Sequence, residues 1–404
     1  MSIQLTNVEI LLYLSIPLTS GLVGWFTNYL ALKMTFYPIE FVGIRPIGWQ
    51  GIIPSKTRKM AEKSVDLLTQ KLLKMEEQFA KIDPEVVAEE MRPGLEEVSR
   101  KITDEVMHSQ IPEVWDRTPK TIKESIYETA EQELPIVVKQ MMADIKANIN
   151  ELLDLKRLSV SILMKDKALV NEIFLRCGKV EFKFIERSGF YFGFLFGFTQ
   201  MVIFYFFKPW WLLPLFGLIV GFITNWLAIK LIFEPKNPLK LGPFVVQGLF
   251  QKRQLEVAKE YSDIVSSKIL TTEGLFEYMV RGPGAEKLAV LLKEHVETVV
   301  DNTAGASKGI ITFFSGEERM SIIKSIVFFR FQQELPISIR QVFNYAEEAL
   351  DLRNNLRTKM SALSPEEFEG FLRPAFQEDE IILIMIGAFL GCLAGFAQYF
   401  ILFS

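Results

Sequence analysis

The chain has 404 residues, of which 49% are hydrophobic, and a positive mean hydropathy of +0.21. This composition is too apolar for an ordinary soluble protein and too polar for a chain that lies wholly in lipid, so it predicts membrane spans joined to water-exposed domains. The net charge of −4 argues against a basic nucleic-acid-binding surface spread over the chain, and the two cysteines, Cys177 and Cys392, exclude a disulfide framework.

Four uncharged stretches predict transmembrane helices, because each has the roughly 20 residues that are needed to cross about 30 Å of hydrocarbon. They begin at Ile10, Ser188, Pro209 and Ile381. The chain is therefore expected to divide into a first span with an outer N-terminus in 1–36, a cytoplasmic helical domain in 37–187, a second span in 188–207, an outer turn at 208–211, a third span in 209–230, a second cytoplasmic helical domain in 231–380 and a fourth span in 381–404.

Lysine and arginine are distributed unequally around the predicted spans. They cluster after the first span, before the second and after the third, whereas the short turn between the second and third spans carries only Lys208. Because cytoplasmic loops of membrane proteins are enriched in these residues, both large loops are expected in the cytoplasm and both termini outside. The predicted location is therefore the inner, or cytoplasmic, cell membrane, with several passes through the bilayer.

The sequence repeats itself at a nearly fixed spacing. Residues 22–38 read LVGWFTNYLALKMTFYP, and residues 219–235, which lie 197 positions later, read IVGFITNWLAIKLIFEP. Further matches continue along the chain, such as Leu153-Asp-Leu-Lys with Leu350-Asp-Leu-Arg. A spacing held over such a length predicts two tandem copies of one unit. Both copies enter and leave the membrane in the same direction, so they are expected to be parallel repeats with a pseudo-twofold axis along the membrane normal.

Both cytoplasmic parts are predicted to be helical. Apolar residues recur near helical spacing in segments that proline separates, and strand-like alternation is scarce. The expected helices cover 54–80, 84–108, 119–150 and 158–176 in the first copy, and 252–270, 284–300 and 337–360 in the second. The predicted fold class is an all-α integral membrane protein, with four transmembrane helices from two parallel tandem repeats and two helical cytoplasmic domains.

Three motifs resemble those of a known family. Residues 24–33 and 221–230 both read Gly-x-x-Thr-Asn-(Tyr/Trp)-Leu-Ala-(Leu/Ile)-Lys, residues 48–54 read Gly-Trp-Gln-Gly-Ile-Ile-Pro, and residues 178–193 read Gly-x-x-Glu-Phe-x-Phe-Ile-x-x-Ser-Gly-x-x-x-Gly. With these motifs the chain resembles domain-of-unknown-function family 445, a family of bacterial membrane proteins, over most of both copies. The second copy departs from the pattern, because Gln251 stands where the first copy has Pro54. The resemblance implies a membrane protein and supplies no reaction, substrate or cofactor.

Small and polar residues line one face of each predicted span. Small residues let helix backbones approach closely in lipid, where the hydrophobic effect cannot drive association. The first interpretation is a tight four-helix bundle in which each buried amide faces its equivalent in the other copy. The alternative is that these amides line a path or a ligand site. The candidate residues are Thr27, Asn28, Thr224, Asn225, Gln200, Gln398, Gly189, Gly193, Gly197, Gly387, Gly391 and Gly395.

Basic residues mark the inner ends of the spans. The default expectation is that Lys33 and Lys230 extend their side chains toward lipid phosphate. The alternative is a dedicated lipid-headgroup site, for which the candidate residues are Lys33, Lys230, Arg45, Lys56 and Arg58. The apolar segments 41–53 and 239–250 either lie along the inner leaflet or are buried under the helical domain.

Catalysis is not indicated by the sequence. Glu133 and Glu334 precede prolines in both copies, but no nucleophile, histidine or metal ligand recurs beside them, so they are interpreted as exposed glutamates at helix-entry prolines. His108 and His295 have no second histidine or cysteine at ligand spacing. Because phosphate-binding and dinucleotide-binding motifs are missing as well, neither catalytic residues nor a metal or other cofactor are expected.

These features favour a non-catalytic role at the cytoplasmic leaflet, in membrane organisation or lipid handling. The alternative is a small transporter or channel that uses the polar residues within the four-helix bundle. Proton- or cation-coupled carriers usually need an acid or base within the membrane, and none lies in the middle of a predicted span. The expected partners are membrane lipids, together with a second copy of the chain or another membrane protein, and no nucleic acid.

Overall fold

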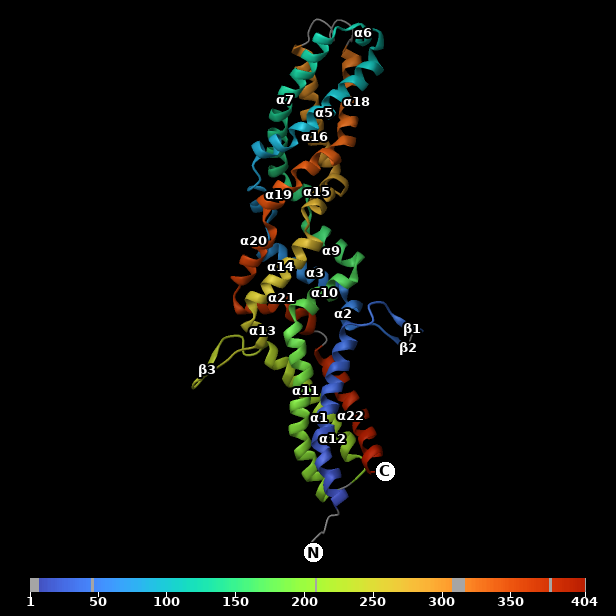
Figure 1. Ribbon diagram of the computed structural model, residues 1–404, viewed down its shortest axis with the longest axis vertical. Helices are drawn as coiled ribbons and strands as arrows, with labels where there is room; N and C mark the ends of the chain where they lie inside the picture. The colour runs from blue at the N-terminus through green and yellow to red at the C-terminus, as the bar shows by residue number, and fades with distance from the viewer. Residues whose placement is uncertain (1–6, 45–46, 208, 307–316, 378–379, 404) are drawn as a thin grey trace. The chain divides into compact units, whose positions relative to one another are not determined.

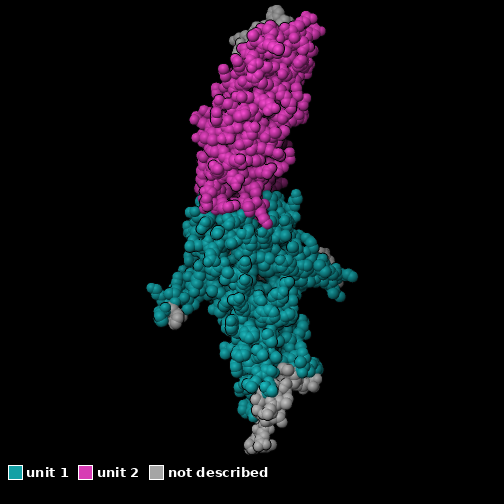
Figure 2. All heavy atoms as spheres, viewed as in Figure 1, with its two compact units in different colours: residues 1–71, 160–264, 356–404 teal, residues 72–159, 265–355 magenta. Residues whose placement is uncertain are grey.

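Two compact units make up the protein, shown here as a computed structural model (Figure 1). The structure describes residues 7–44, 47–207, 209–306, 317–377 and 380–403. Unit 1 comprises residues 1–71, 160–264 and 356–404, and unit 2 comprises residues 72–159 and 265–355 (Figure 2). Almost every described element is a helix, so the prediction of an all-α protein is confirmed except for two short hairpins.

Four long helices form a bundle in unit 1. They are α1 (Asn7–Phe36), α11 (Lys179–Phe206), α12 (Leu212–Phe233) and α22 (Glu380–Phe403). Three of the described helices are long and apolar enough to cross a membrane, namely α11, α12 and α22. Helix α1 has 30 residues, which correspond to about 45 Å at 1.5 Å per residue. The predicted outer turn includes Lys208, which lies outside the described residues.

The bundle consists of two closely packed helix pairs. Helix α1 packs along α11, and α12 packs along α22. Contacts between α11 and α12, and between α1 and α22, join the two pairs (Figure 1). The helices closest in space are therefore the two predicted spans of the same sequence copy.

Two antiparallel hairpins correct the prediction that all secondary structure is helical. β1 (Val42–Ile44) pairs with β2 (Ile47–Trp49), and β3 (Leu239–Leu241) pairs with β4 (Phe244–Val246). β-branched and aromatic residues favour strands here, and Gly43 and Gly242 supply backbone φ angles of +130° and +60°. With three residues each, these strands are too short for alternation to reveal them in the sequence.

Unit 1 also contains short helices, some directly after the hairpins and others where the chain returns from unit 2. They are α2 (Ile52–Ser55), α3 (Thr57–Leu67), α9 (Leu155–Lys165), α10 (Lys167–Cys177), α13 (Leu249–Lys252), α14 (Gln254–Ile264), α20 (Leu352–Ser361) and α21 (Pro365–Gln377), of which α9 and α20 begin in unit 2. The single helix predicted for residues 54–80 is therefore wrong. The chain leaves helical geometry at Lys56, which has φ −113° and ψ 20°, and again at the extended residue Lys74.

Several local features recur at the spacing of the sequence repeat. The hairpins at 42–49 and 239–246 are separated by 197 positions, as are the π-helical turns Leu68–Leu72 and Val265–Ile269. Two cis peptide bonds, Tyr37–Pro38 and Glu234–Pro235, have the same separation. The hairpins and π-helical turns therefore recur at the same spacing as the residue motifs.

Four long helices also form unit 2. They are α5 (Pro84–Gln110), α7 (Lys120–Ala147), α16 (Ala285–Ala306) and α18 (Glu317–Ser338). The shorter elements are α4 (Met75–Phe79), α6 (Pro112–Arg117), α8 (Ile149–Leu152), α15 (Thr272–Arg281), the 3₁₀ turn Ile339–Val342 and α19 (Phe343–Leu350). Helix α5 starts where Asp83 accepts a 2.8 Å hydrogen bond from the backbone N–H of Glu85, with Pro84 in the first turn.

Two prolines in unit 2 correct a further prediction. Pro135 lies inside α7 and Pro336 lies inside α18, so neither marks a helix entry. A proline removes one helical hydrogen bond, a cost that contacts with neighbouring helices can offset. Here α7 packs against α5 and α16, and α18 packs against the same two helices, so tertiary contacts carry both helices through their prolines.

Candidate functional site

The glycine stripes lie where the paired membrane helices come closest. A Cβ atom placed on Gly193 would lie 2.5 Å from the carbonyl oxygen of Ser20, and one placed on Gly197 would lie 2.5 Å from the Cα of Pro17. In the second pair, a Cβ on Gly391 would overlap the carbonyl of Gly217. Backbone contacts of the same kind occur at Gly24, Gly189, Gly221 and Gly395, whereas a Cβ on Gly387 would meet the side-chain amide of Asn225 first. These residues therefore let the two helix backbones of each pair touch.

The two asparagines of the bundle bond within their own helix pair. Asn28 is fully buried, and its Nδ2 donates to the carbonyl of Ile185 at 2.8 Å. The Nδ2 of Asn225 donates to the carbonyl of Leu383 at 3.1 Å. Each asparagine therefore donates to a backbone carbonyl of its packed partner helix, while both line one small cavity. Thr27 and Thr224 bond carbonyls of their own helices, one turn back.

The two glutamines join helices in different ways. Gln200 accepts a hydrogen bond of 2.7 Å from the hydroxyl of Ser20, within the first helix pair. Gln398 donates to the hydroxyl oxygen of Thr19 at 2.7 Å and so connects the second pair to the first. These hydrogen bonds therefore connect each glutamine to a hydroxyl group of α1 and do not join the two glutamines to each other.

Because Asn28 and Asn225 bond different carbonyl groups, we expect their substitutions to lower the stability of the protein independently. We expect Asn28→Ala and Asn225→Ala each to cost about 0.6 kcal/mol, and at most about 1.7 kcal/mol, as for other hydrogen bonds between membrane helices. The double variant should lose the sum of the two to within about 0.5 kcal/mol, since no bond is shared. Unfolding of the purified protein in mixed micelles measures these losses. A double loss well below the sum would show that the asparagines are coupled, by a shared bond or through the cavity that both line.

A small cavity of about 40 Å³ lies at one end of the bundle in unit 1. Its lining includes Asn28, Asn225 and Glu181. The Oδ1 atom of Asn28 is buried and has no hydrogen-bond partner among the described residues. A cavity of this size is large enough for a water molecule and has polar groups to hold one. A water molecule in this cavity would therefore supply the missing hydrogen bond to the Oδ1 atom of Asn28.

A buried ion pair adjoins this cavity. The guanidinium of Arg253 donates to both carboxylate oxygens of Glu181, at 2.8 and 2.6 Å, and the Glu181 side chain is only 2% exposed. Burial acts to lower the pKa of Arg253, but its hydrogen bonds to Glu181 and Glu256 outweigh burial and raise the pKa above its ordinary value. The pair joins the first turn of α11 to the start of α14, and sequence reasoning did not find it because 72 positions separate its members.

The candidate headgroup residues make local contacts. The ammonium of Lys33 lies 5.7 Å from the ring centroid of Tyr29, and that of Lys230 lies 5.0 Å from the ring of Trp226. Arg58 pairs with Glu62 at 3.0 Å on α3. Lys56 lies at the end of α2, and Arg45 lies outside the described residues. Both lysines thus lie near an aromatic side chain one turn earlier in the same helix, and Lys230 also lies 3.8 Å from a carboxylate oxygen of Glu234. Their predicted reach toward lipid phosphate stays a prediction.

Sequence reasoning also missed a cavity of about 130 Å³ in unit 2. Helices α5, α7, α16 and α18 surround it with apolar side chains, among them Leu95, Met141, Val296 and Phe331. The hydroxyl of Thr303 also lines the cavity and has no hydrogen-bond partner among the described residues. We call this space the unit 2 cavity. The sequence does not reveal this cavity, because the residues that line it have the same apolar spacing as residues that fill a core completely.

The acidic candidates in unit 2 are engaged in separate polar contacts. Glu133 accepts a 2.7 Å hydrogen bond from the side-chain amide of Asn302, and Glu334 pairs with Lys101 at 2.7 Å. His295 lies 2.7 Å from a carboxylate oxygen of Asp144. Within the described ranges, no group of three or more histidine, cysteine or acidic residues could hold a metal ion. Unit 2 therefore offers an apolar space, and these acidic residues are each engaged by a different neighbour.

Curated proteins that are similar to this chain are named as membrane proteins. Over 200 residues the chain is 25% identical to a UPF0754 membrane protein of Bacillus mycoides strain KBAB4, a match that covers 43% of this chain and 52% of that protein. Over 89 residues it is 34% identical to a UPF0754 membrane protein of Bacillus cereus strain AH187, covering 21% of this chain and 24% of the relative. The chain thus spans about half the length of these curated relatives, or less. No family model and no solved structure matches it. The named relatives and the apolar helices of unit 1 together identify a membrane protein.

Proposed function

We propose that the chain is a non-catalytic membrane protein that handles lipid, and that the unit 2 cavity holds a lipid acyl chain. The observation that carries this proposal is the cavity of about 130 Å³ lined almost wholly by apolar side chains. An engineered apolar cavity of about 150 Å³ stays dry and binds small apolar molecules. The unit 2 cavity thus suits an apolar ligand better than water.

The energy of an empty cavity supports the same conclusion. An unfilled apolar space leaves its lining side chains without van der Waals partners, which costs free energy that rises with the volume left empty. A bound acyl chain offsets that cost, because its methylene groups leave water or lipid for a close-packed apolar environment. Membrane lipids are the most abundant apolar molecules available to a protein anchored in the bilayer.

The proposal includes a specific membrane arrangement. We infer that α1 is a fourth span, since it packs along α11 over its length as α12 packs along α22. The shared spacing of hairpins and π-helical turns supports a tandem duplication, and the motifs quoted above support membership of family 445. With lysine and arginine concentrated in the large loops, both loops face the cytoplasm of the cell and the role lies at the inner leaflet. The contacts of the polar bundle residues are those of helix packing.

Photo-crosslinking tests the proposed acyl-chain site. The full chain is reconstituted in vesicles that contain a phospholipid with a photoreactive diazirine in its acyl chain, and crosslinked peptides are mapped by mass spectrometry. We expect crosslinks on α5, α7 and α16. Val296→Phe should abolish them, because Val296 is buried and lines the cavity, whereas Val290→Phe on the same helix should leave them unchanged, because Val290 is 60% exposed. Crosslinks confined to the membrane helices would contradict the proposal.

A small transporter or channel is the second candidate function. The observation in its favour is the unpartnered Oδ1 atom of Asn28, which lies beside the bundle cavity of about 40 Å³. Each of the other amides makes one hydrogen bond to a protein partner, which makes it less available to bind a permeant species. Solute flux into proteoliposomes that is lost in Asn28→Ala, without loss of folded protein, would favour this candidate.

A further inference from the structure

Both hairpins expose apolar side chains that the acyl-chain cavity does not explain. Ile44 and Ile47 are 85% and 83% exposed, and Val42 is 63% exposed. In the other hairpin, Leu239 and Val245 are 55% and 51% exposed. A two-stranded hairpin alone in water is at best marginally stable, and an exposed apolar edge invites pairing with other chains. An apolar environment that covers the hairpins would remove both problems.

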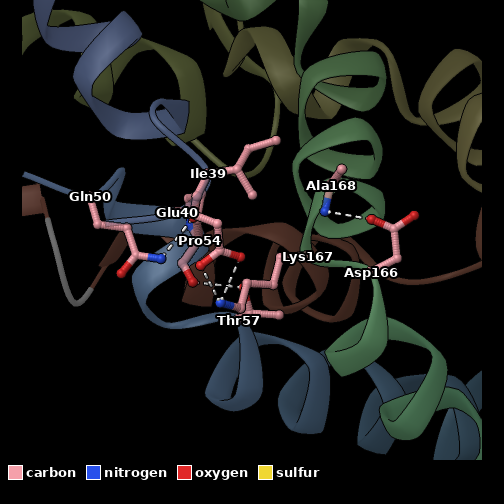
Figure 3. Close-up of polar contacts among 8 residues, drawn as sticks. All are labelled: Ile39, Glu40, Gln50, Pro54, Thr57, Asp166, Lys167 and Ala168. Carbon is pink, nitrogen blue, oxygen red and sulfur yellow. Dashed lines mark hydrogen bonds and ion pairs between the residues drawn. The ribbon is translucent and has the colours of Figure 1, made fainter. Parts of the chain in front are cut away.

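The root of the first hairpin is fixed to the end of α1. The indole N–H of Trp49 donates to the carbonyl of Met34 at 3.2 Å, in the last turn of that helix. The side-chain amide of Gln50 donates to the carbonyl of Ile39 at 2.7 Å, which closes the base of the hairpin (Figure 3). The first strand begins at Val42, six residues after α1 ends at Phe36. The distance of this hairpin from the end of the membrane helix is therefore set by short, directed contacts.

A second brace connects this root to α10. The ammonium of Lys167 lies 3.0 Å from both carboxylate oxygens of Glu40, next to the base of the hairpin (Figure 3). Lys167 is itself positioned by the start of α10, where Asp166 accepts a 3.0 Å hydrogen bond from the backbone N–H of Ala168. The hairpin root is thus held by contacts with both α1 and α10, while its apolar strands project outward from the rest of unit 1 (Figure 2).

The second hairpin is anchored in the corresponding way. Gln247 donates from its side-chain amide to the carbonyl of Lys236 at 3.2 Å, and the backbone N–H of Gly248 donates to Pro235 at 2.9 Å. The ammonium of Lys236 pairs with Glu369 at 2.7 Å. This hairpin also begins six residues after its membrane helix ends. Both hairpins therefore occupy the same level relative to the ends of α1 and α12.

We propose that the two hairpins insert their apolar side chains into the phospholipid leaflet at which α1 and α12 end. They project from opposite sides of unit 1 (Figure 2), so together they would widen the footprint of the bundle in that leaflet. Lys33 and Lys230, in the last turns of these helices, and the exposed Lys240 on β3 place positive charge where lipid phosphates lie. The inference rests on the membrane embedding of unit 1 and is independent of the acyl-chain site in unit 2.

Spin labels on the full chain test the depth of the hairpins. The two native cysteines are replaced by alanine, and single cysteines are introduced as Ile44→Cys, Ile47→Cys and Val245→Cys, all at exposed positions that the fold does not need. Leu255→Cys is the matched control, since Leu255 is also apolar and 69% exposed but lies on α14. Each labelled protein is reconstituted in phosphatidylethanolamine–phosphatidylglycerol vesicles, and relaxation by oxygen is compared with relaxation by a water-soluble nickel chelate.

We expect the three hairpin labels to be relaxed mainly by oxygen, at about 5–10 Å below the headgroup boundary, and the Leu255→Cys label mainly by the nickel chelate. Three hairpin labels as accessible to the chelate as the control would overturn the proposal. Spin–spin broadening at the hairpin labels that disappears on dilution with unlabelled protein, without lipid exposure, would also overturn it and identify a second copy as the covering partner. The crosslinking result in unit 2 is independent of all these outcomes.

Discussion

Leucine in place of Gly193 or Gly391 is expected to prevent the membrane helices of unit 1 from packing. A Cβ atom at Gly193 already meets the carbonyl of Ser20, and one at Gly391 meets that of Gly217. The obstruction is backbone, which cannot rotate aside as a side chain can. We therefore expect a stability loss at or above the roughly 1–3 kcal/mol that is typical of overpacked cores. The loss is measured as a fall in the melting temperature of the detergent-solubilised protein.

The matched controls for this prediction are Leu195→Ile and Leu393→Ile. Each lies two residues from one of the glycines on the same helix, and the two leucines are 62% and 49% exposed. An isomeric apolar side chain on a lipid-facing surface keeps the volume unchanged, so these variants should melt as the original protein does. Equal melting of the glycine and leucine variants would show that the glycines face lipid.

Arg253→Met is expected to destabilise unit 1 by about 3 kcal/mol, near the lower end of the range for broken buried ion pairs. The substitution leaves the carboxylate of Glu181 only 2% exposed and without its cation. The Arg253 side chain is 16% exposed in the native pair, which is why the lower end of that range applies. The free energy of unfolding by denaturant in mixed micelles provides the measurement.

Two further variants separate the ion pair from a general effect of losing an arginine. Glu181→Met combined with Arg253→Met should be more stable than Arg253→Met alone, because no unpaired charge remains in the interior. Arg281→Met removes an exposed arginine that pairs with Glu277 at 3.0 Å, and it should cost about 0–1 kcal/mol. If Arg253→Met cost no more than Arg281→Met, the buried pair would not be a stabilising element of the native protein.

Three of the four predicted spans coincide with helices that are long and apolar enough to cross a membrane, and they could be predicted because a span has few alternatives. A long uncharged helix is stable in the hydrocarbon of a bilayer and rarely elsewhere. Small residues spaced four apart mark the face on which two such helices approach each other. The partners of the polar residues could not be predicted in this way. Asn28 bonds a backbone carbonyl of α11, and every residue supplies such a carbonyl, so the sequence carries no sign of which one is used.

The hairpins and the unit 2 cavity were missed for different physical reasons. The strands have three residues each, so alternation cannot be read from them. The available sequence signal was the pair of glycines, Gly43 and Gly242, which adopt positive φ in the structure. The cavity arises where helices from distant parts of the chain, such as α5 and α16, fail to fill the space between them. Apolar periodicity predicts that these faces are buried but not how completely they interlock. Pro135 and Pro336 show the same limit, since packing carries helices through residues that usually end them.

A density map of the full chain in lipid nanodiscs tests the central claim most directly. The claim is that the cavity between α5, α7, α16 and α18 holds a lipid acyl chain. We predict an elongated, unbranched density along the cavity, in contact with side chains such as Leu95 and Val296, and its loss in Val296→Phe. A cavity that is empty, or closed by its own side chains, in the lipid-reconstituted protein would contradict the claim.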